Sequence, residues 1–132
     1  MLKSKSLVQK LGIQPGFRIF VAGAPRPYEK IVGELPDAAT IVDRPVKNID
    51  MIHVFATERM ALGKLAGYRK AITPGGMIWI SWPKKASGVP TDLTDTIVRE
   101  LASPLGLVDV KVCAVDATWS GLKFVIRREL RT

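Results

Sequence analysis

The sequence predicts a three-layer α/β domain whose mostly parallel sheet of about six strands ends in an antiparallel hairpin. Apolar runs of strand length alternate with stretches of helical periodicity along the chain, which is typical of an α/β domain. The near-continuous apolar run at 77–82, MIWISW, is typical of a parallel strand covered on both faces. Residues 116–121 alone separate the last two strand patterns, and this connection is too short for a parallel crossover.

Six stretches have the composition of strands and are bounded by turn residues. The first follows the QPG turn at 14–16, and the fourth follows the TPGG turn at 73–76. The last two alternate apolar with polar residues, so one face of each is expected to be less buried. The expected strands are 17–23, 39–43, 51–56, 77–82, 107–115 and 122–128.

Three stretches have the spacing of an amphipathic helix. The first begins near Tyr28 and stops at the LPD sequence at 35–37. Thr57 is expected to cap the second, and Thr91 the third, because a threonine hydroxyl accepts a hydrogen bond from a free N–H of the first turn. The expected apolar faces are Tyr28, Ile31, Val32 and Leu35; Ala61, Leu65, Tyr68 and Ile72; and Leu93, Ile97, Val98 and Leu101.

The length and composition indicate one ordinary globular domain. We expect a single domain over 1–132, with a basic N-terminal segment at 1–14, because no linker, repeat or low-complexity tract divides the chain. The chain is 47% apolar, yet no run approaches the roughly 18 apolar residues of a membrane span. The N-terminus lacks the apolar core of a secretory signal, so we expect a cytoplasmic protein.

The net charge of +8, from 20 basic and 12 acidic residues, favours encounters with anions. Two interpretations stand: the charge serves a nucleic acid or another anionic partner, or it belongs to a solvated surface and a weakly ordered terminus. The basic residues near the two ends are Lys3, Lys5 and Lys10, and Arg127, Arg128 and Arg131. No membrane partner is expected, and the oligomeric state stays open.

The rare reactive side chains favour structural roles. One cysteine, Cys113, excludes an internal disulfide, and together with one histidine it cannot supply a zinc site, so neither a metal nor a cofactor is expected. His53 lies between two apolar residues of a strand and is expected to be a hydrogen-bonded core histidine. Trp119 is expected to pack over one end of the sheet, and Gly121 to provide φ freedom in the hairpin.

The candidate site lies where parallel strands end, because loops and helix N-termini converge at that edge of an open sheet. Lys84 and Lys85 lie in the loop before the helix that Thr91 is expected to cap, where free N–H groups favour an anion. Trp82 could form a flat wall for a ring. The alternative is that Trp82 packs on the sheet and the lysines are solvated. The candidate ligand-binding residues are Trp82, Lys84, Lys85, Ser87, Gly88, Thr91, Gly23 and Asp43.

Two sets of motifs resemble known proteins. The stretch TPGGMIWI at 73–80 is similar to the turn and strand of class I methyltransferases. The stretches WPKKASG at 82–88, TDLT at 91–94, VDVKVCAVD at 108–116 and WSGL at 119–122 resemble a small bacterial family of unknown function. That resemblance covers nearly the whole chain and implies a truncated methyltransferase-like, Rossmann-like fold, but no chemistry.

The loop after the first strand departs from the methyltransferase pattern. Residues 21–27 read VAGAPRP, with one glycine and two prolines, in place of the alternating glycines that let the backbone approach the cofactor. Asp43, at the end of the second strand, could take the place of the acid that binds a ribose. The resemblance therefore implies a fold without the usual cofactor loop.

These observations leave three functional hypotheses. The leading one is a non-catalytic methyltransferase-like domain that binds a small anionic or nucleotide-like ligand, or a macromolecule, at the edge from Trp82 to Asp92. The alternatives are a methyltransferase that binds S-adenosylmethionine (SAM) through an atypical loop, and a nucleic-acid-binding module. The sequence favours a protein that is not an enzyme.

Overall fold

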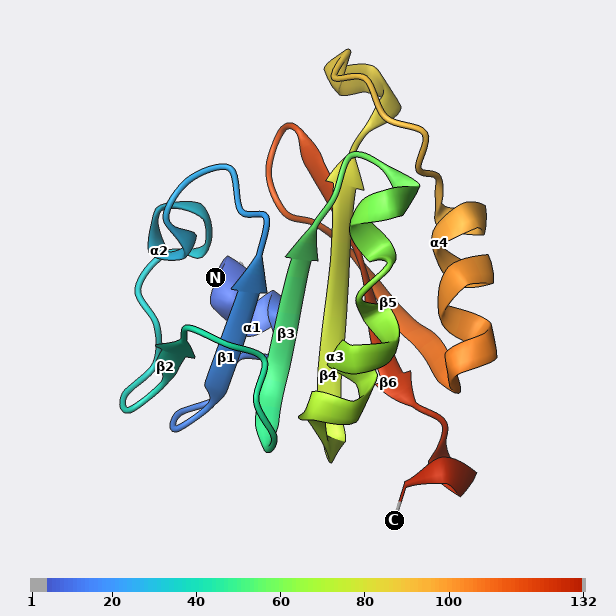
Figure 1. Ribbon diagram of the computed structural model, residues 1–132. Coiled ribbons are helices and arrows are strands. Elements are labelled where there is room, and N and C mark those ends of the chain that lie inside the picture. Colours follow the sequence, from blue (N-terminus) through green and yellow to red (C-terminus); the bar gives the residue numbers. More distant parts are fainter. Residues whose placement is uncertain (1–4, 132) are drawn as a thin grey trace.

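A six-stranded sheet forms the middle layer of the structure, a computed structural model that describes residues 5–131 (Figure 1). The strands lie in the order β2-β1-β3-β4-β6-β5. The first four are parallel, and β6 is antiparallel to both of its neighbours. The bounds are β1 (Arg18–Ala22), β2 (Thr40–Val42), β3 (Ile49–Phe55), β4 (Ile72–Pro83), β5 (Leu107–Ala114) and β6 (Trp119–Ile126). The predicted fold class, including the final hairpin, is confirmed.

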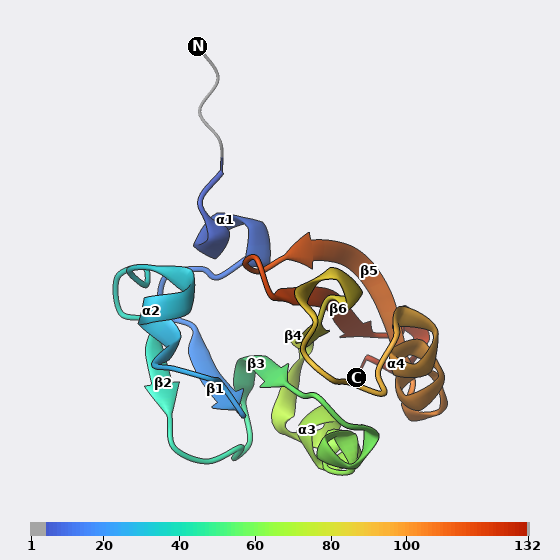
Figure 2. The same cartoon turned by 90° about the horizontal axis from the view of Figure 1, so that it is seen from above.

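Short helices cover both faces of this sheet (Figure 2). Helices α1 and α2 lie on one side, and α3 and α4 lie on the other. The α-helices are α1 (Leu7–Leu11), α2 (Tyr28–Val32), α3 (Leu65–Ala71) and α4 (Asp95–Ala102). The 3₁₀ turns are η1 (Arg59–Leu62), η2 (Lys85–Ser87), η3 (Ser103–Leu105) and η4 (Arg128–Leu130). No helix within residues 5–131 combines the length and the apolar character needed to cross a membrane.

The core lies on both sides of β3 and β4. Residues 51–56 and 76–83 are all buried, and successive side chains point into opposite layers. Ile78, Ile80 and Trp82 pack toward α3 and α4, whereas Met77 and Trp79 pack toward α1 and α2. The apolar run that predicted a strand covered on both faces is therefore explained by its central place in the sheet.

The basic segment 1–14 contains a helix that the sequence did not predict. Ser6 and Gln9 form a reciprocal capping box at the start of α1, and Gly12 ends the helix in the left-handed region. Trp79 Nε1 donates to the carbonyl of Leu11 at 2.9 Å, and Lys111 Nζ donates to the carbonyl of Lys10 at 2.6 Å. The described part of this segment is thus an ordered, docked layer; Lys3 lies outside the described residues.

Two of the predicted helix starts are wrong. Glu58, not Thr57, precedes η1, and α3 begins only at Leu65. Thr94, not Thr91, caps α4, because its side chain accepts from the N–H of Ile97 at 3.2 Å. In both cases the threonine that matches the cap pattern in the sequence is not the residue that directly precedes the helix.

The sequence predicts the TPGG stretch at 73–76 as a turn before the fourth strand, and this prediction is wrong. The stretch lies inside β4, between two pairs of the register with β3: Ile49 with Ile72, and Met51 with Met77. The extra residues bulge out of the parallel ladder. A β-carbon on Gly76 would lie 3.0 Å from the Thr73 carbonyl oxygen and 3.1 Å from that of Asp50, so a larger residue here would require the backbone of the bulge to shift.

A polar column crosses the buried core between α2, β3 and β4. His53 is 0% exposed, its Nδ1 lies 2.7 Å from the Tyr28 hydroxyl, and its Nε2 lies 2.7 Å from Ser81 Oγ. A neutral imidazole donates one of these hydrogen bonds and accepts the other. The ring also stacks on Phe55, with centroids 4.3 Å apart. The prediction of a hydrogen-bonded core histidine is confirmed.

Burial lowers the pKa of His53 to about 3, so the folded protein excludes a proton that the unfolded chain binds below its ordinary pKa of 6.5. Stability is therefore complete above pH 6.5 and falls as the pH drops toward 3. Between pH 7 and pH 5 we expect the free energy of unfolding to fall by about 2 kcal/mol, measured by urea unfolding.

The chain has one histidine, so the variant His53→Gln isolates the effect. It should be less stable than the wild type and show a much flatter pH dependence over this window. In the wild type, the NMR signals of the imidazole ring should not titrate between pH 7 and pH 5. A midpoint of the ring near pH 6 in the native state would contradict the burial argument.

Candidate functional site

The loops that follow β1, β3 and β4 lie at one edge of the molecule, where the arrowheads of these strands point (Figure 1). Phe55 pairs with Ser81 at this edge, and a β-carbon on Gly23 would overlap the carbonyl oxygen of Phe55. The Gly23 turn and the loop that follows Trp82 therefore lie on the same rim of the sheet, as the sequence predicts.

The loop after β4 is held mainly by its own hydrogen bonds. The N–H of Lys84 donates to the carbonyl of Thr118 at 2.7 Å. Ser87 Oγ donates to the carbonyl of Lys84 at 2.6 Å and accepts from the N–H of Val89 at 3.2 Å. Gly88 has a φ of +76° and ends the 3₁₀ turn η2. The observed roles of Ser87 and Gly88 are thus to shape the loop.

Thr91 has a structural bond in place of its predicted cap. Its Oγ1 donates to the carbonyl of Thr57 at 2.6 Å and accepts from the N–H of Leu93 at 3.1 Å. Leu93 then packs in the same core cluster as Val98, one turn into α4. The residue before the cap and the fourth helical residue thus have the positions of a hydrophobic staple, which agrees with Thr94 as the cap of α4 and Asp95 as its first residue.

A hollow of about 390 Å³ lies beneath this loop, between α4 and the β4–β6–β5 side of the sheet. Three of the candidate residues, Trp82, Lys85 and Thr91, line it. Its apolar walls are Pro83, Leu93, Val112 and Leu122, and the polar groups Thr94, Asp95, Arg99 and Ser120 complete the lining. A smaller hollow of about 350 Å³ lies between Thr57, Glu58 and residues 90–92.

The Trp82 side chain lines the hollow of about 390 Å³. The residue is 8% exposed, and its Nε1 forms no hydrogen bond within residues 5–131. No fully buried side-chain nitrogen or oxygen lacks a partner in the same residues, so this N–H keeps some contact with solvent. Trp79, by contrast, satisfies its N–H with the Leu11 carbonyl.

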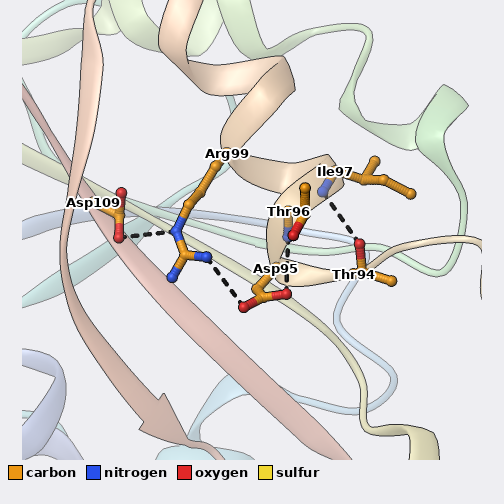
Figure 3. A network of polar contacts seen from close by, with 6 residues as sticks. All are labelled: Thr94, Asp95, Thr96, Ile97, Arg99 and Asp109. Atoms are coloured by element: carbon orange, nitrogen blue, oxygen red, sulfur yellow. Dashed lines mark hydrogen bonds and ion pairs between the residues drawn. The ribbon is translucent and has the colours of Figure 1, made fainter.

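The two cationic residues that line the hollow, Arg99 and Lys85, differ in their ion pairs. Figure 3 shows Arg99 between two carboxylates: its Nη1 lies 3.1 Å from Asp95, and its Nε lies 3.1 Å from Asp109. These hydrogen bonds raise the pKa of Arg99. Lys85, in the described part of the chain, has no ion pair. Lys85 is therefore the cation of the lining that has no ion pair there, while the charges of Lys85, Arg99, Asp95 and Asp109 together sum to zero.

Gly23 and Asp43 do not belong to this hollow. The hollow opens on the α4 side of the sheet, whereas the Gly23 loop leads into α2 on the other side. Asp43 is exposed after β2. Gly23 and Asp43 therefore share the rim with the loop after β4 but do not line this hollow.

Side chains of the protein occupy the rim above β3. Trp119 is 9% exposed and lies edge-on to Phe55, with ring centroids 5.3 Å apart. Arg26, in the loop after β1, forms an ion pair of 3.4 Å with Asp116 in the turn between β5 and β6. The predicted packing role of Trp119 is confirmed. Gly121 lies in β6 rather than in the turn, and it is needed for space, since a β-carbon there would come within 2.9 Å of Ser81 Oγ.

Three of the solved structures that share this fold are methyltransferase or RNA-processing proteins. A SAM-dependent methyltransferase from Aquifex aeolicus is 14% identical, with a TM-score of 0.65 over 91% of this chain and 88% of that chain. The fibrillarin pre-rRNA processing protein of Methanococcus jannaschii is 12% identical, with a TM-score of 0.62 over 87% and 68%. Magnesium protoporphyrin IX methyltransferase from Synechocystis PCC 6803, solved with bound SAM, is 11% identical, with a TM-score of 0.57 over 91% and 74%.

These similarities show the fold: the chain has the Rossmann-like fold of class I SAM-dependent methyltransferases. No protein-family model matches the chain, and no curated protein matches it either. The resemblance of the sequence to a methyltransferase-like fold without an assigned activity is thus confirmed at the level of the fold.

The rim above β1 and β3 does not fit SAM. A glycine in a cofactor loop leaves room for the cofactor, whereas the missing side chain of Gly23 leaves room for the carbonyl of Phe55. Trp119 covers the end of β3, and the Arg26–Asp116 pair connects the two loops beside it. Asp43 is exposed, whereas protein side chains lie over part of the rim between it and β3.

Sequence reasoning missed several residues of the hollow. Ser120 lines it because it lies directly opposite Trp82 in the β4–β6 register, and Arg99 because α4 packs over β5. Val112 is on the neighbouring strand and is 63% exposed. The antiparallel hairpin was predicted, but a register one residue away would have turned Ser120 to the other face.

Gly23→Ala should destabilise the protein by at least about 2 kcal/mol in urea unfolding, because the residue has a φ of +73° and its new methyl would overlap the Phe55 carbonyl. Gly67→Ala is the matched control: it lies in α3, and nothing is within 4 Å of the added carbon, so this change should be neutral or stabilising. Equal stabilities of the two variants would contradict this close packing.

Proposed function

We propose that the protein binds a small molecule in the hollow beneath the Trp82–Asp92 loop, and that it has a methyltransferase-like fold without using the cofactor crevice of that fold. The observation that carries the proposal is a hollow of about 390 Å³ lined by the largely buried Trp82, whose indole N–H has no protein partner within the described residues. Because this N–H is not fully buried, water can meet it, and a ligand acceptor can take the place of that water.

The shape and lining of the hollow support this function. Its volume lies within the range of about 300–1,000 Å³ that is typical of small-molecule sites. Five of the eleven lining residues are apolar or aromatic, and six carry polar or charged groups, so the hollow offers both an apolar surface and groups that can orient a ligand. The described groups include no cluster of histidine, cysteine or carboxylate side chains that could hold a metal, so binding would rest on the side chains themselves.

Binding is tested by titrating the protein with a library of small planar compounds and recording NMR spectra of the three indole N–H groups. A ligand of the hollow should shift the signal of Trp82 and leave that of Trp79 in place, because Trp79 donates to Leu11. The signals are assigned with Trp82→Phe. A library in which no compound moves the Trp82 signal at millimolar concentration would overturn the proposal.

Val112→Phe should lower the affinity of such a ligand at least about tenfold, because a ring at this exposed position fills the hollow. Val110→Phe is the matched control, since Val110 is 54% exposed on the same strand but does not line the hollow. Both variants should melt close to the wild type. Equal losses of affinity would place the binding site elsewhere.

A SAM-dependent methyltransferase is the second candidate, favoured by the exposed Asp43 at the end of β2. Under our proposal, calorimetry with millimolar SAM gives no binding heat and the cofactor does not raise the melting temperature. Binding heat that disappears in Asp43→Asn would favour the methyltransferase instead.

A further inference from the structure

The polar groups that are free to meet a ligand in the hollow are hydrogen-bond donors. The Trp82 indole can only donate, and the Lys85 ammonium can only donate. The Ser120 hydroxyl forms no recorded hydrogen bond within the described residues and can donate as well. The carboxylate of Asp95 is already held by Arg99 and by the N–H of Thr96 at 2.9 Å. The free groups therefore select a ligand that accepts hydrogen bonds.

Two of these donors lie side by side. Trp82 and Ser120 are direct partners in the antiparallel pairing of β4 with β6, and both side chains line the same hollow. Side chains opposite each other in such a pair start about 5 Å apart at their β-carbons. An indole N–H and a hydroxyl at that spacing can each donate to one oxygen of a planar carboxylate.

The charge of the hollow limits the charge of the ligand. Arg99 is compensated by two carboxylates, so Lys85 is left as the uncompensated charge of the lining. The single ammonium group of Lys85 can pair with a carboxylate, which carries one negative charge. A phosphate monoester carries about 1.5 to 2 negative charges at neutral pH and would stay partly unbalanced.

The apolar walls of the hollow favour a ligand in which the charged group is attached to a flat apolar ring. Trp82 offers an aromatic surface, and Pro83, Leu93 and Leu122 remove apolar atoms of a ligand from water. Since these groups lie on the same side of the sheet as α4, a ring can rest on them while its acidic group meets the donors.

We infer that the ligand of this hollow is a planar ring compound with a single carboxylate, held by Trp82 Nε1, Ser120 Oγ and Lys85 Nζ. This inference rests on the proposed function and makes it specific. The position of the loop at the sheet edge is compatible with both an aromatic monocarboxylate and a nucleotide. The inference selects the aromatic monocarboxylate.

The test compares three probes: 2-naphthoate, the neutral 2-naphthamide of the same shape, and adenosine monophosphate. Affinity is measured by NMR from the shift of the Trp82 indole signal. We expect 2-naphthoate to bind at least about tenfold more tightly than either of the others, because its charge-assisted hydrogen bonds are stronger than neutral ones.

Lys85→Gln should remove most of the preference for 2-naphthoate over the amide, while the amide keeps its affinity. Lys84→Gln is the matched control, because it removes the same charge from the neighbouring residue, which does not line the hollow. Lys85 is exposed, so melting temperatures should be unchanged in both variants.

The outcomes separate the two claims. If no planar compound, charged or neutral, shifts the Trp82 signal, the proposed function itself fails. If the amide or the nucleotide binds as tightly as 2-naphthoate, the hollow is a binding site but the inferred carboxylate is wrong. An equal loss of preference in Lys84→Gln would also overturn the inference, because only the overall charge would then matter.

Discussion

The parallel pairing of β3 with β4 is the constraint on which the rest of the molecule depends. Both strands are buried on both faces, so each needs a layer of helices above and below, and the short helices of this chain supply those layers. The same pairing fixes the direction of the strands. Because β1, β3 and β4 all end at one edge, the loops that carry the polar residues meet there.

At that edge the two sides of the methyltransferase-like fold differ in this protein. In an open parallel sheet, ligands bind beyond the carboxyl ends of the strands. Here Trp119 and the Arg26–Asp116 pair occupy part of that space, on the side of α2. The open space lies instead on the side of α4, where the loop between β4 and α4 arches over Trp82. The buried column of Tyr28, His53 and Ser81 lies on the side of α2, and both ring nitrogens of His53 are hydrogen-bonded.

The candidate site could be predicted only in part. The dilysine loop was recognised because a tryptophan and two lysines follow a buried strand, and Trp82, Lys85 and Thr91 do line one hollow. The role of Ser87 and Gly88 was not recognisable, because a loop that satisfies its own hydrogen bonds has the same composition as one that binds a ligand. Gly23 and Asp43 were grouped with the loop because the order of the strands predicts which residues lie along one rim of the sheet. The order of the strands does not predict on which face of the sheet a residue of that rim lies.

The sequence by itself determined the order of the strands and helices, the single histidine of the core and the final hairpin, because these follow from local periodicity, from apolar content and from the length of a connection. Only the tertiary structure decided the helix at 7–11, the caps and the partners of each side chain. The docking of α1 depends on Trp79 and Lys111, which are distant in the sequence. The pairing of Trp82 with Ser120 depends likewise on a register between strands. Such contacts are chosen by packing in three dimensions, and no local pattern encodes which of two nearby threonines caps a helix or which face of a sheet remains open.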